Sequence, residues 1–341
     1  MIHKRKSRLI ATILTLITVF LCSCSCSDSK GNVGDNAFKN PSEKVEQSQY
    51  EGFSVHYLDV GQGDCIFIKF DDGKIMLIDC GANSKSNEEY IKSYLKTHEI
   101  TNIDYFILTH PDADHVGNAE VLINDFSIGK VYLPDIRGLE RFPDYEPVKK
   151  LIDEKQIPIE YSTMGDKIIG DNYSVAFLSP LERKESESSY KTLDGASNPT
   201  ETEINNVSPI IYLVVEGVRF LFTGDAGKIQ ENLVINNYKV GLYKKLFKDV
   251  DVNLSCIDYL KVSHHGSNDA SGEDFLNLLK PKNAIISVGG GNSYGHPYSD
   301  LLVRLESSSP DYRLFRTDVS GTVVVYKDNN GSYLVSTDLD S

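Results

Sequence analysis

The segment whose residue types most clearly indicate a functional site is 109–117, which reads Thr-His-Pro-Asp-Ala-Asp-His-Val-Gly. It follows the apolar run 103–108 directly, so a buried strand is expected to end where these polar residues begin. So dense a His/Asp cluster beside an apolar strand is costly unless a cation neutralises it. The segment therefore predicts a metal site with these candidate ligands: His110, Asp112, Asp114 and His115.

Polar groups of the same kind follow other apolar runs. Five of the chain's eight histidines lie in only three such segments, which are 109–117, 263–267 and 289–297. This convergence predicts one metal site gathered at one edge of a sandwich. The further candidates after the apolar runs are Asp79, Asp225, His264, His265 and His296.

Short strand patterns alternate with helical stretches along the chain. The mixture predicts an α/β sandwich with mostly hairpin-linked sheets. Residues 181–206 are polar and without hydrophobic period, which is typical of a surface loop or mobile lid. We expect strands at 53–58, 65–70, 74–78, 103–108, 130–133, 173–178, 210–215, 218–222, 256–262, 284–288 and 321–327, and helices at 87–98 and 274–279.

The N-terminus predicts export. Residues 3–8 are basic and the next 13, residues 9–21, are apolar, which is short for a membrane span of about 20 residues and typical of a secretory signal. The following Leu-Cys-Ser-Cys resembles the bacterial lipobox, so Cys24 is the expected lipidated residue; Cys26, or an uncleaved signal anchor, is the alternative. We expect a signal peptide over 1–23, a flexible tether over 24–50 and one domain over 51–329, lipid-anchored at the outer face of the cell membrane.

Composition narrows the class of protein further. Hydrophobic residues make up 40% of the chain, which excludes wholesale disorder, and only one long apolar run exists, which excludes a polytopic membrane protein. The formal charge is −14, and removal of residues 1–23 leaves 31 basic against 49 acidic residues, or −18. Such a charge argues against a general nucleic-acid-coating protein. The odd set Cys65, Cys80 and Cys256 predicts no disulfide framework; the first two are expected to be buried free thiols.

The ordered set of motifs resembles the metallo-β-lactamase superfamily and, more narrowly, the extracellular hydrolase domain of the ComEC competence family. The resemblance spans about residues 53–326 and implies a four-layer αββα sandwich with a two-metal site between its sheets. The large membrane channel region of the competence proteins has no counterpart, so the chain resembles a free-standing, lipid-anchored hydrolase part. The motifs that carry the resemblance are 58–64, 77–81, 109–117, 205–208, 223–225, 264–267, 292–297 and 316–318.

The resemblance also implies roles for individual residues. These are His110 and Asp112 for one metal, Asp114 and His115 for the second, Asp225 as a bridge between both, and Asp79 as a hydrogen-bonding brace of the metal loop.

This chain departs from the superfamily pattern at two ligand positions. Asp112 stands where the superfamily has its second histidine, and Asn205 stands where the third-motif histidine is expected. Both exchanges replace nitrogen by oxygen, which suits harder ions, so the two divalent metals are expected to be Zn²⁺ or Mn²⁺. The last histidine ligand stays open: His264 is favoured, and His265 and His296 are each a ligand or a substrate contact.

A two-metal site of this kind predicts hydrolysis. Two cations about 3.5–4 Å apart lower the pKa of a bridging water and clamp the attacked group, so metal-bound hydroxide would attack a phosphodiester. Asp114 would guide the proton and His296 would protonate the leaving group. Gly266, Ser267 and His265 would contact the substrate phosphate.

We therefore expect a surface phosphodiesterase or nuclease acting on DNA or RNA. The negative charge of the chain weakens the expectation of a nucleic-acid substrate. The basic segment 243–248 fits the exposed face of a helix better than a patch that binds nucleic acid. Another surface phosphodiester, such as a teichoic acid or phosphorylcholine ester, is the alternative substrate. Because Asn205 replaces an expected histidine ligand, a non-catalytic anchored binding module stays an alternative. A β-lactamase is disfavoured, because Asp225 stands where lactam-cleaving enzymes commonly have cysteine. The sequence points to no protein partner.

Overall fold

The structure is a computed structural model that describes residues 50, 52–136, 142–181 and 200–339 of the chain. The expected signal peptide, the lipidation site Cys24 and all of the expected tether except Tyr50 lie outside the described residues. Residues 182–199, the main part of the expected loop 181–206, also lie outside them. In the part that is described, no helix is long and apolar enough to cross a membrane.

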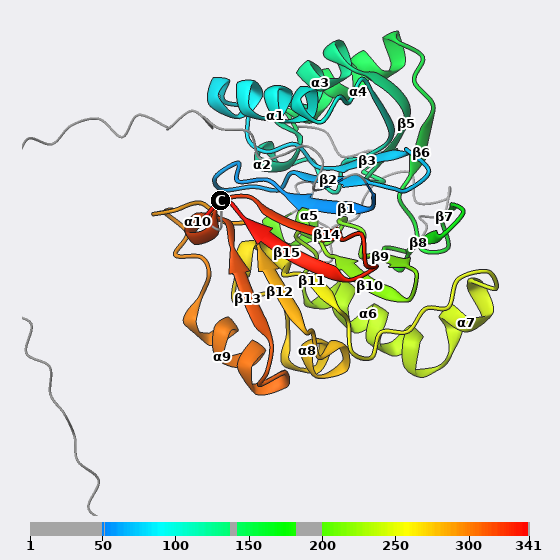
Figure 1. Cartoon of the computed structure of the whole chain (residues 1–341), viewed down its shortest axis with the longest axis vertical. Helices are drawn as coiled ribbons and strands as arrows, with labels where there is room; N and C mark the ends of the chain where they lie inside the picture. The colour runs from blue at the N-terminus through cyan, green and yellow to red at the C-terminus, as the bar shows by residue number, and fades with distance from the viewer. Residues whose placement is uncertain (1–49, 51, 137–141, 182–199, 340–341) are drawn as a thin grey trace, which may run out of the picture. The chain divides into compact units, whose positions relative to one another are not determined.

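Two mixed β-sheets lie face to face in the described part of the domain (Figure 1). The first runs in the order β15-β14-β1-β2-β3-β4-β5-β6 and the second in the order β13-β12-β11-β10-β9-β8-β7. The strands of the first sheet are β1 (Ser54–Tyr57), β2 (Ile66–Lys69), β3 (Ile75–Ile78), β4 (Asn102–Ile107), β5 (Ser127–Leu133), β6 (Ile159–Tyr161), β14 (Val323–Lys327) and β15 (Tyr333–Thr337). Those of the second are β7 (Lys167–Ile169), β8 (Tyr173–Phe177), β9 (Ile211–Val215), β10 (Val218–Phe222), β11 (Tyr259–Lys261), β12 (Asn283–Ile286) and β13 (Arg313–Arg316).

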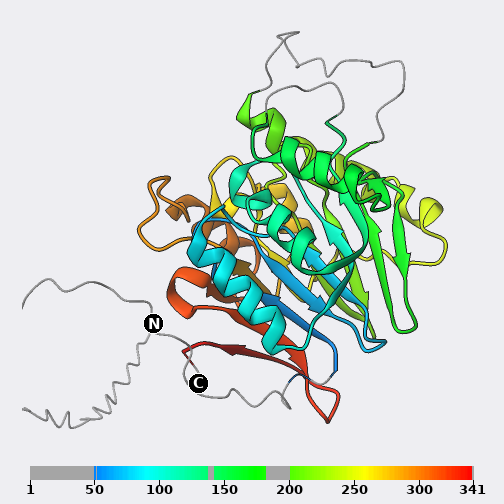
Figure 2. The same cartoon turned by 90° about the horizontal axis from the view of Figure 1, so that it is seen from above.

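Helices cover the outer face of each sheet (Figures 1 and 2). Against the first sheet lie α1 (Lys85–Thr97), α2 (Ala113–Val116), α3 (Ala119–Asp125) and α4 (Tyr145–Glu154). Against the second lie α6 (Lys228–Lys239), α7 (Leu242–Leu246), α8 (Glu273–Leu279) and α9 (Ser299–Ser308). The short helical turns α5 (Glu201–Asn205), η2 (Ser263–Gly266) and α10 (Thr317–Ser320) lie in the connections.

Because helices cover one face of each sheet and the other sheet covers its second face, central strands are apolar on both sides. In β2, Ile66 and Ile68 point into the layer between the sheets, whereas Phe67 points toward the helices. Each such fully buried side chain contributes roughly 1.5–3 kcal/mol to folding. Separate apolar layers therefore fill the space outside the first sheet, between the sheets and outside the second sheet. The fold is the expected four-layer αββα sandwich, and that prediction is confirmed.

The connections differ from the expectation of mostly hairpin-linked sheets. β3 to β6 pair in parallel, and so do β10 to β13, because helices carry the chain back between these strands. Hairpins join β1 to β2, β2 to β3, β7 to β8 and β9 to β10, whereas β8 and β9 pair antiparallel across a long connection that contains α5. Parallel strands end at the same edge of their sheet, so the residues after β3 and β4, and those after β10, β11 and β12, are brought together in two sets.

The limits of the folded part also differ from those expected. Tyr50, expected in the tether, is buried against Val324 and Tyr326. Strand β15 lies beyond residue 329, where we expected the domain to end, and pairs antiparallel with β14. Helix α5 lies inside the segment expected to be a loop; the Thr200 side chain caps its first turn, so a local hydrogen bond replaces the missing hydrophobic period.

Two smaller expectations hold. Cys65 and Cys80 are buried free thiols. The basic segment 243–248 includes helix α7, whose Tyr243 is buried while Lys244 and Lys245 are exposed. This arrangement is that of an amphipathic helix with a solvated basic face.

We predict that Gly117→Ala lowers the free energy of unfolding by about 1–3 kcal/mol, the usual cost of overpacking. A Cβ at this position, just after α2, would lie 2.2 Å from the Asn83 backbone nitrogen and 2.5 Å from the Ala113 carbonyl oxygen. Urea unfolding measures the change. Gly290→Ala is the control, since its Cβ would meet nothing nearer than Asp318 at 3.9 Å. Equal stability of the two variants would contradict this account of the packing around α2.

Candidate metal centre

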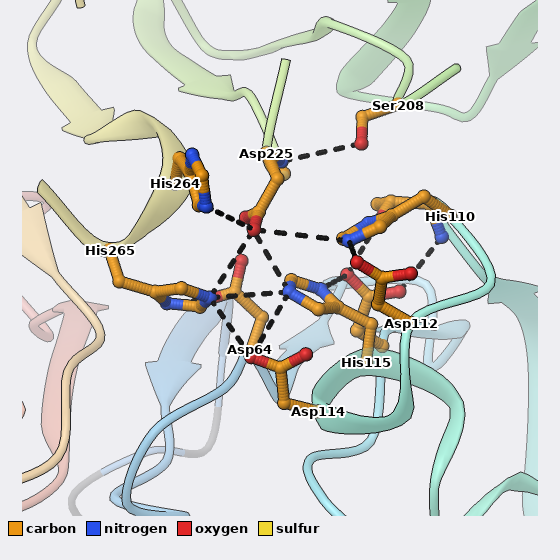
Figure 3. A network of polar contacts seen from close by, with 12 residues as sticks. Asp64, His110, Asp112, Asp114, His115, Ser208, Asp225, His264 and His265 are labelled. Atoms are coloured by element: carbon orange, nitrogen blue, oxygen red, sulfur yellow. Dashed lines mark hydrogen bonds and ion pairs between the residues drawn. The ribbon is translucent and has the colours of Figure 1, made fainter. Parts of the chain in front are cut away.

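The polar residues that follow the parallel strands of both sheets meet in one cluster (Figure 3). Asp79 follows β3, and the segment 109–116 follows β4 and runs into α2. From the second sheet, Asp225 follows β10, and His264 and His265 form the turn η2 after β11. The structure thus brings together the first-sheet and second-sheet candidates that lie far apart in the sequence.

Asp225 lies at the centre of this cluster and is almost fully buried. Its carboxylate oxygens lie 3.8 Å from Nε2 of His110, 3.4 Å from Nε2 of His115, 3.7 Å from Nε2 of His264 and 3.5 Å from Nε2 of His265. These distances are long for hydrogen bonds. They match ligands that share an ion, because metal–ligand bonds of about 2.1 Å place neighbouring ligands roughly 3.4 Å apart.

Besides the group of Asp64, Asp79 and His115, the candidate ligand atoms form two overlapping groups. One group contains His110, His115 and Asp225, and the other contains Asp114, His115 and His265. Asp112 extends the first group, because its carboxylate lies 3.7 Å from Nε2 of His110. The arrangement could therefore hold two cations, one on either side of Asp225.

Unsatisfied polar atoms show that the residues present fit metal ions. Nε2 of His110 and Oδ1 of Asn205 are buried and have no hydrogen-bond partner among the described residues. Leaving such atoms unpaired costs about 1–3 kcal/mol each. The amide nitrogen of Asn205 is 3.3 Å from Nε2 of His264, so Asn205 lies beside one of the four imidazoles that face Asp225. Cations in this cluster would satisfy these atoms.

The charges of the cluster also demand cations. Burial lowers the pKa of His110 to about 3 and raises the pKa of Asp112 to about 6. Burial opposes protonation of His265 as well, but Asp225 and Asp114 outweigh it and raise the pKa of His265 to about 10. The carboxylates therefore hold a proton on His265 where no metal is present, and divalent ions would supply positive charge in its place.

Asp79 braces the ligand loop from below. One oxygen accepts hydrogen bonds from the Thr109 hydroxyl at 2.7 Å and from Nδ1 of His115 at 2.8 Å, and the other accepts from the Thr109 backbone N–H at 2.8 Å. This leaves Nε2 of His115 directed at Asp225. Asp79 thus lies where the brace was expected, behind a ligand rather than among the ligands.

The turn η2 presents two successive histidines to the cluster. His264 and His265 both have left-handed backbone conformations, with φ of 50° and 52°, which non-glycine residues rarely adopt. Nδ1 of His265 is hydrogen-bonded to the Ser287 carbonyl, and Nδ1 of His264 to Asp269. Each Nε2 consequently faces Asp225. His265 is the more deeply buried and belongs to the Asp114 group, which favours a metal ligand among the two roles left open for it.

The remaining candidates lie at the margin of the cluster. Gly266 packs against Pro297, where a Cβ would lie 2.5 Å from the proline Cβ, so its lack of a side chain serves packing. Ser267 is nearly buried next to it. The His296 ring lies 5.5 Å from the His264 ring and outside both ligand groups. Burial and His264 lower the pKa of His296 to about 4, which weakens its expected role as proton donor.

Sequence reasoning missed a buried ion pair behind His265. The Lys261 ammonium and the Asp64 carboxylate, both almost fully buried, are 2.6 Å apart, and the other Asp64 oxygen lies 3.6 Å from Nδ1 of His265. Gly63, which precedes Asp64, lets the chain approach the ligand loop closely, since a Cβ at Gly63 would lie 2.4 Å from the Asp114 carbonyl oxygen. The available signal was a lysine at the end of an otherwise apolar strand.

A second missed feature holds the loop 268–272, which follows η2. The Glu231 carboxylate accepts hydrogen bonds from the backbone N–H groups of Ser271 and Gly272. From the other side, Arg304 donates to the Asn268 side chain and to backbone carbonyls of the loop. The loop carries Asp269, so these contacts fix the partner that orients His264. No local pattern connects α6, the loop and α9 in the sequence.

Comparison with known proteins identifies the superfamily of this fold. The sequence profile described as the metallo-beta-lactamase superfamily matches residues 58–290. The chain therefore belongs to the metallo-β-lactamase superfamily, whose hydrolase fold implies divalent metal binding by the clustered His and Asp residues.

The chain is 30% identical to ComE operon protein 3 of Bacillus subtilis over 82% of its own length and 34% of that protein. It is 25% identical to competence protein ComA of Neisseria gonorrhoeae over 79% of its length and 32% of that protein. These are ComEC-family proteins, so the expected resemblance is confirmed, and the chain spans about a third of their length. Among solved structures, the metallo-beta-lactamase fold protein YhfI from Bacillus subtilis matches 79% of this chain and 98% of its own, with 10% identity and a TM-score of 0.45.

We predict that Asp79→Asn weakens metal binding about 10- to 100-fold, because the amide cannot fix the orientation and basicity of His115 as the carboxylate does. Isothermal titration calorimetry with Mn²⁺ and Zn²⁺ measures the affinity. Asp258→Asn is the matched control, since Asp258 also accepts a backbone N–H, that of Arg219, but precedes β11 at the end away from the site. Unchanged affinity in Asp79→Asn would show that Asp79 is not a brace for a metal ligand.

We predict that metal ions stabilise the folded chain. A metal that binds only the folded state at about 100 times its Kd adds roughly 2.7 kcal/mol of stability per site. Thermal unfolding with Mn²⁺, with Zn²⁺ and with a chelator measures the shift in Tm. His110→Ala should lose most of the shift, whereas Glu120→Ala, an exposed residue of α3, should keep it. A Tm insensitive to metal and chelator alike would overturn the assignment of a metal site.

Proposed function

We propose that the chain is a metal-dependent phosphodiesterase that cleaves nucleic-acid strands. The observation that carries the proposal is the cluster around Asp225, in which four imidazoles and three carboxylates converge on space for two cations. When bound, two such ions would acidify a water and neutralise the charge that a phosphodiester develops as it is attacked. Competence, a process that handles DNA, appears in the name of one relative and supports a nucleic-acid substrate.

The chain's own residues would divide the work as follows. His110, Asp112 and Asp225 would hold one ion, with Asn205 and His264 beside it. Asp114, His115 and His265 would hold the other, with Asp225 shared.

Asp114 is the ligand best placed to move a proton. Its carboxylate, like that of Asp112, is about one-third exposed, whereas Asp225 is buried, so water can reach it; of the two exposed carboxylates, Asp114 is the one that faces His265. A carboxylate oxygen of Asp114 lies 3.5 Å from Nε2 of His265, and this nearby imidazole opposes protonation of Asp114. Although burial raises it, His115 and His265 hold the pKa of Asp114 below its usual range. Asp114 is therefore an ionised acceptor at neutral pH.

The oxygen-rich donor set bears on the metal. Asp112 and Asn205 replace two nitrogen donors, so Mn²⁺ competes with Zn²⁺ for the first position. The second position, with His115, His265 and Asp114, retains the mixed donors that suit either ion.

A second substrate class is supported by charge. The acidic chain repels polyanions at long range, which favours a zwitterionic phosphodiester such as a phosphorylcholine ester over polyanions such as a nucleic acid or a teichoic acid. We also propose that the chain acts at the cell surface, held to the membrane by a lipid on Cys24; the signal-like segment of the sequence supports this.

The test is turnover of bis(p-nitrophenyl) phosphate by the purified chain with Mn²⁺ or Zn²⁺. We predict activity that chelation removes, and a loss of roughly a hundredfold or more in Asp114→Ala, because the variant lacks a metal ligand and proton acceptor. Glu120→Ala controls for loss of a nearby exposed carboxylate and should retain activity.

The metal content of the purified protein is measured in parallel. Fewer than about one metal per chain together with no turnover would replace the enzyme with a binding module. Full activity in Asp114→Ala would contradict the proposed division of roles. Degradation of single-stranded DNA, compared with release of phosphorylcholine from its esters, separates the two substrate classes.

A further inference from the structure

Three aromatic rings extend from the metal centre toward the surface. They lie in the connection between β12 and α9. The His296 ring meets the His264 ring edge-on at 5.5 Å, and the Tyr294 ring stacks on His296 at 5.6 Å with 25° between the ring planes. Tyr298 lies on another side of His296 at 5.5 Å. A path of rings thus leads from a neighbour of Asp225 to the outside of the protein.

The outer rings are unusually accessible. Tyr294 is 59% exposed and Tyr298 is 42% exposed. Within the described ranges, the other exposed large apolar side chains are aliphatic, so both exposed aromatic rings of that set flank His296. Exposed aromatic surface that gathers beside a catalytic site marks a place where a ligand ring can be covered.

Hydrogen bonds hold the ring-bearing loop in place. The Asn292 side chain donates to the carbonyl oxygens of Gly289 and His296 and accepts from the His296 backbone N–H. The Tyr298 backbone N–H donates to the Gly266 carbonyl at 3.0 Å, which ties the loop to the turn that carries His264 and His265. A surface fixed in this way loses little conformational entropy when a ligand binds.

The ring geometry selects a flat partner. The Tyr294 and His296 rings are inclined by only 25°, with centroids 5.6 Å apart, so this pair does not form the walls that surround a quaternary ammonium group. Because Tyr294 is largely exposed, a nucleobase could extend this stack. Bases of a single strand are free to stack in this way, whereas those of a duplex are already covered. Stacking would also supply affinity that an acidic chain cannot draw from lysine and arginine.

We propose that Tyr294, flanked by Tyr298, is a stacking platform for a base of single-stranded nucleic acid, next to the phosphodiester held at the metal centre. The inference rests on the proposed phosphodiesterase function and narrows its substrate to single strands.

The test is binding of a labelled oligothymidylate with phosphorothioate linkages, which resist cleavage, and of the matching abasic strand, followed by fluorescence anisotropy with Mn²⁺. Stacking is worth about 1–3 kcal/mol per base, so the wild-type chain should prefer the base-bearing strand by about fivefold or more. Tyr294→Ala should lose most of that preference, and Tyr294→Phe should keep it. Ile169→Ala, which removes an exposed apolar side chain on β7, is the control and should keep it too.

Equal binding of both strands by the wild-type chain, or an unchanged preference in Tyr294→Ala, would overturn the platform. The result is independent of turnover. Base-dependent binding without hydrolysis of bis(p-nitrophenyl) phosphate would keep the platform and reject the phosphodiesterase. Hydrolysis without base-dependent binding would do the reverse.

Discussion

The interaction on which the site depends is the attraction between buried carboxylates and positive charge. Asp225 is almost fully buried between the two sheets and faces four imidazoles at 3.4–3.8 Å. Such a carboxylate is costly in a low-dielectric interior unless cations neutralise it. The surrounding structure holds the imidazoles in this arrangement. Nδ1 of His115, His264 and His265 is hydrogen-bonded to Asp79, to Asp269 and to the Ser287 carbonyl, respectively. Each ring therefore has one orientation, and its free nitrogen is directed at Asp225.

The fold explains why these groups can meet. Parallel pairing in β3 to β5 and in β10 to β12 sends the chain out of each sheet at a common edge. Close backbone approaches then complete the site, where Gly63 meets Asp114 and the left-handed residues of η2 turn two successive histidines inward. Strained backbone of this kind persists only where the surrounding contacts over-determine it. The ion pair of Lys261 with Asp64 and the contacts of Glu231 and Arg304 provide that support.

Much of this could be predicted from the sequence where the signal is local. The segment 109–117 concentrates its ligands after one apolar strand, and Asp225 and His264 follow strands that alternate or run apolar, so their convergence follows from topology alone. Other features depend on contacts that no local pattern encodes. The choice between His264 and His265 depends on backbone dihedral angles in η2, and the Lys261–Asp64 pair joins positions distant in sequence. β15 escaped notice because it is an edge strand whose residues are mostly half-buried, and α5 because its capping box, not a hydrophobic period, defines it.

Part of the negative charge of the chain has a role at this site, because Asp112, Asp114 and Asp225 would face the charges of two metals. The position of Asp225 between the two proposed metals is the central claim. Anomalous diffraction from crystals of the Mn²⁺-loaded protein tests that claim most directly. The account predicts two anomalous peaks about 3.5–4 Å apart, one on each side of the Asp225 carboxylate. A single peak, or peaks that Asp225 does not contact, would contradict it.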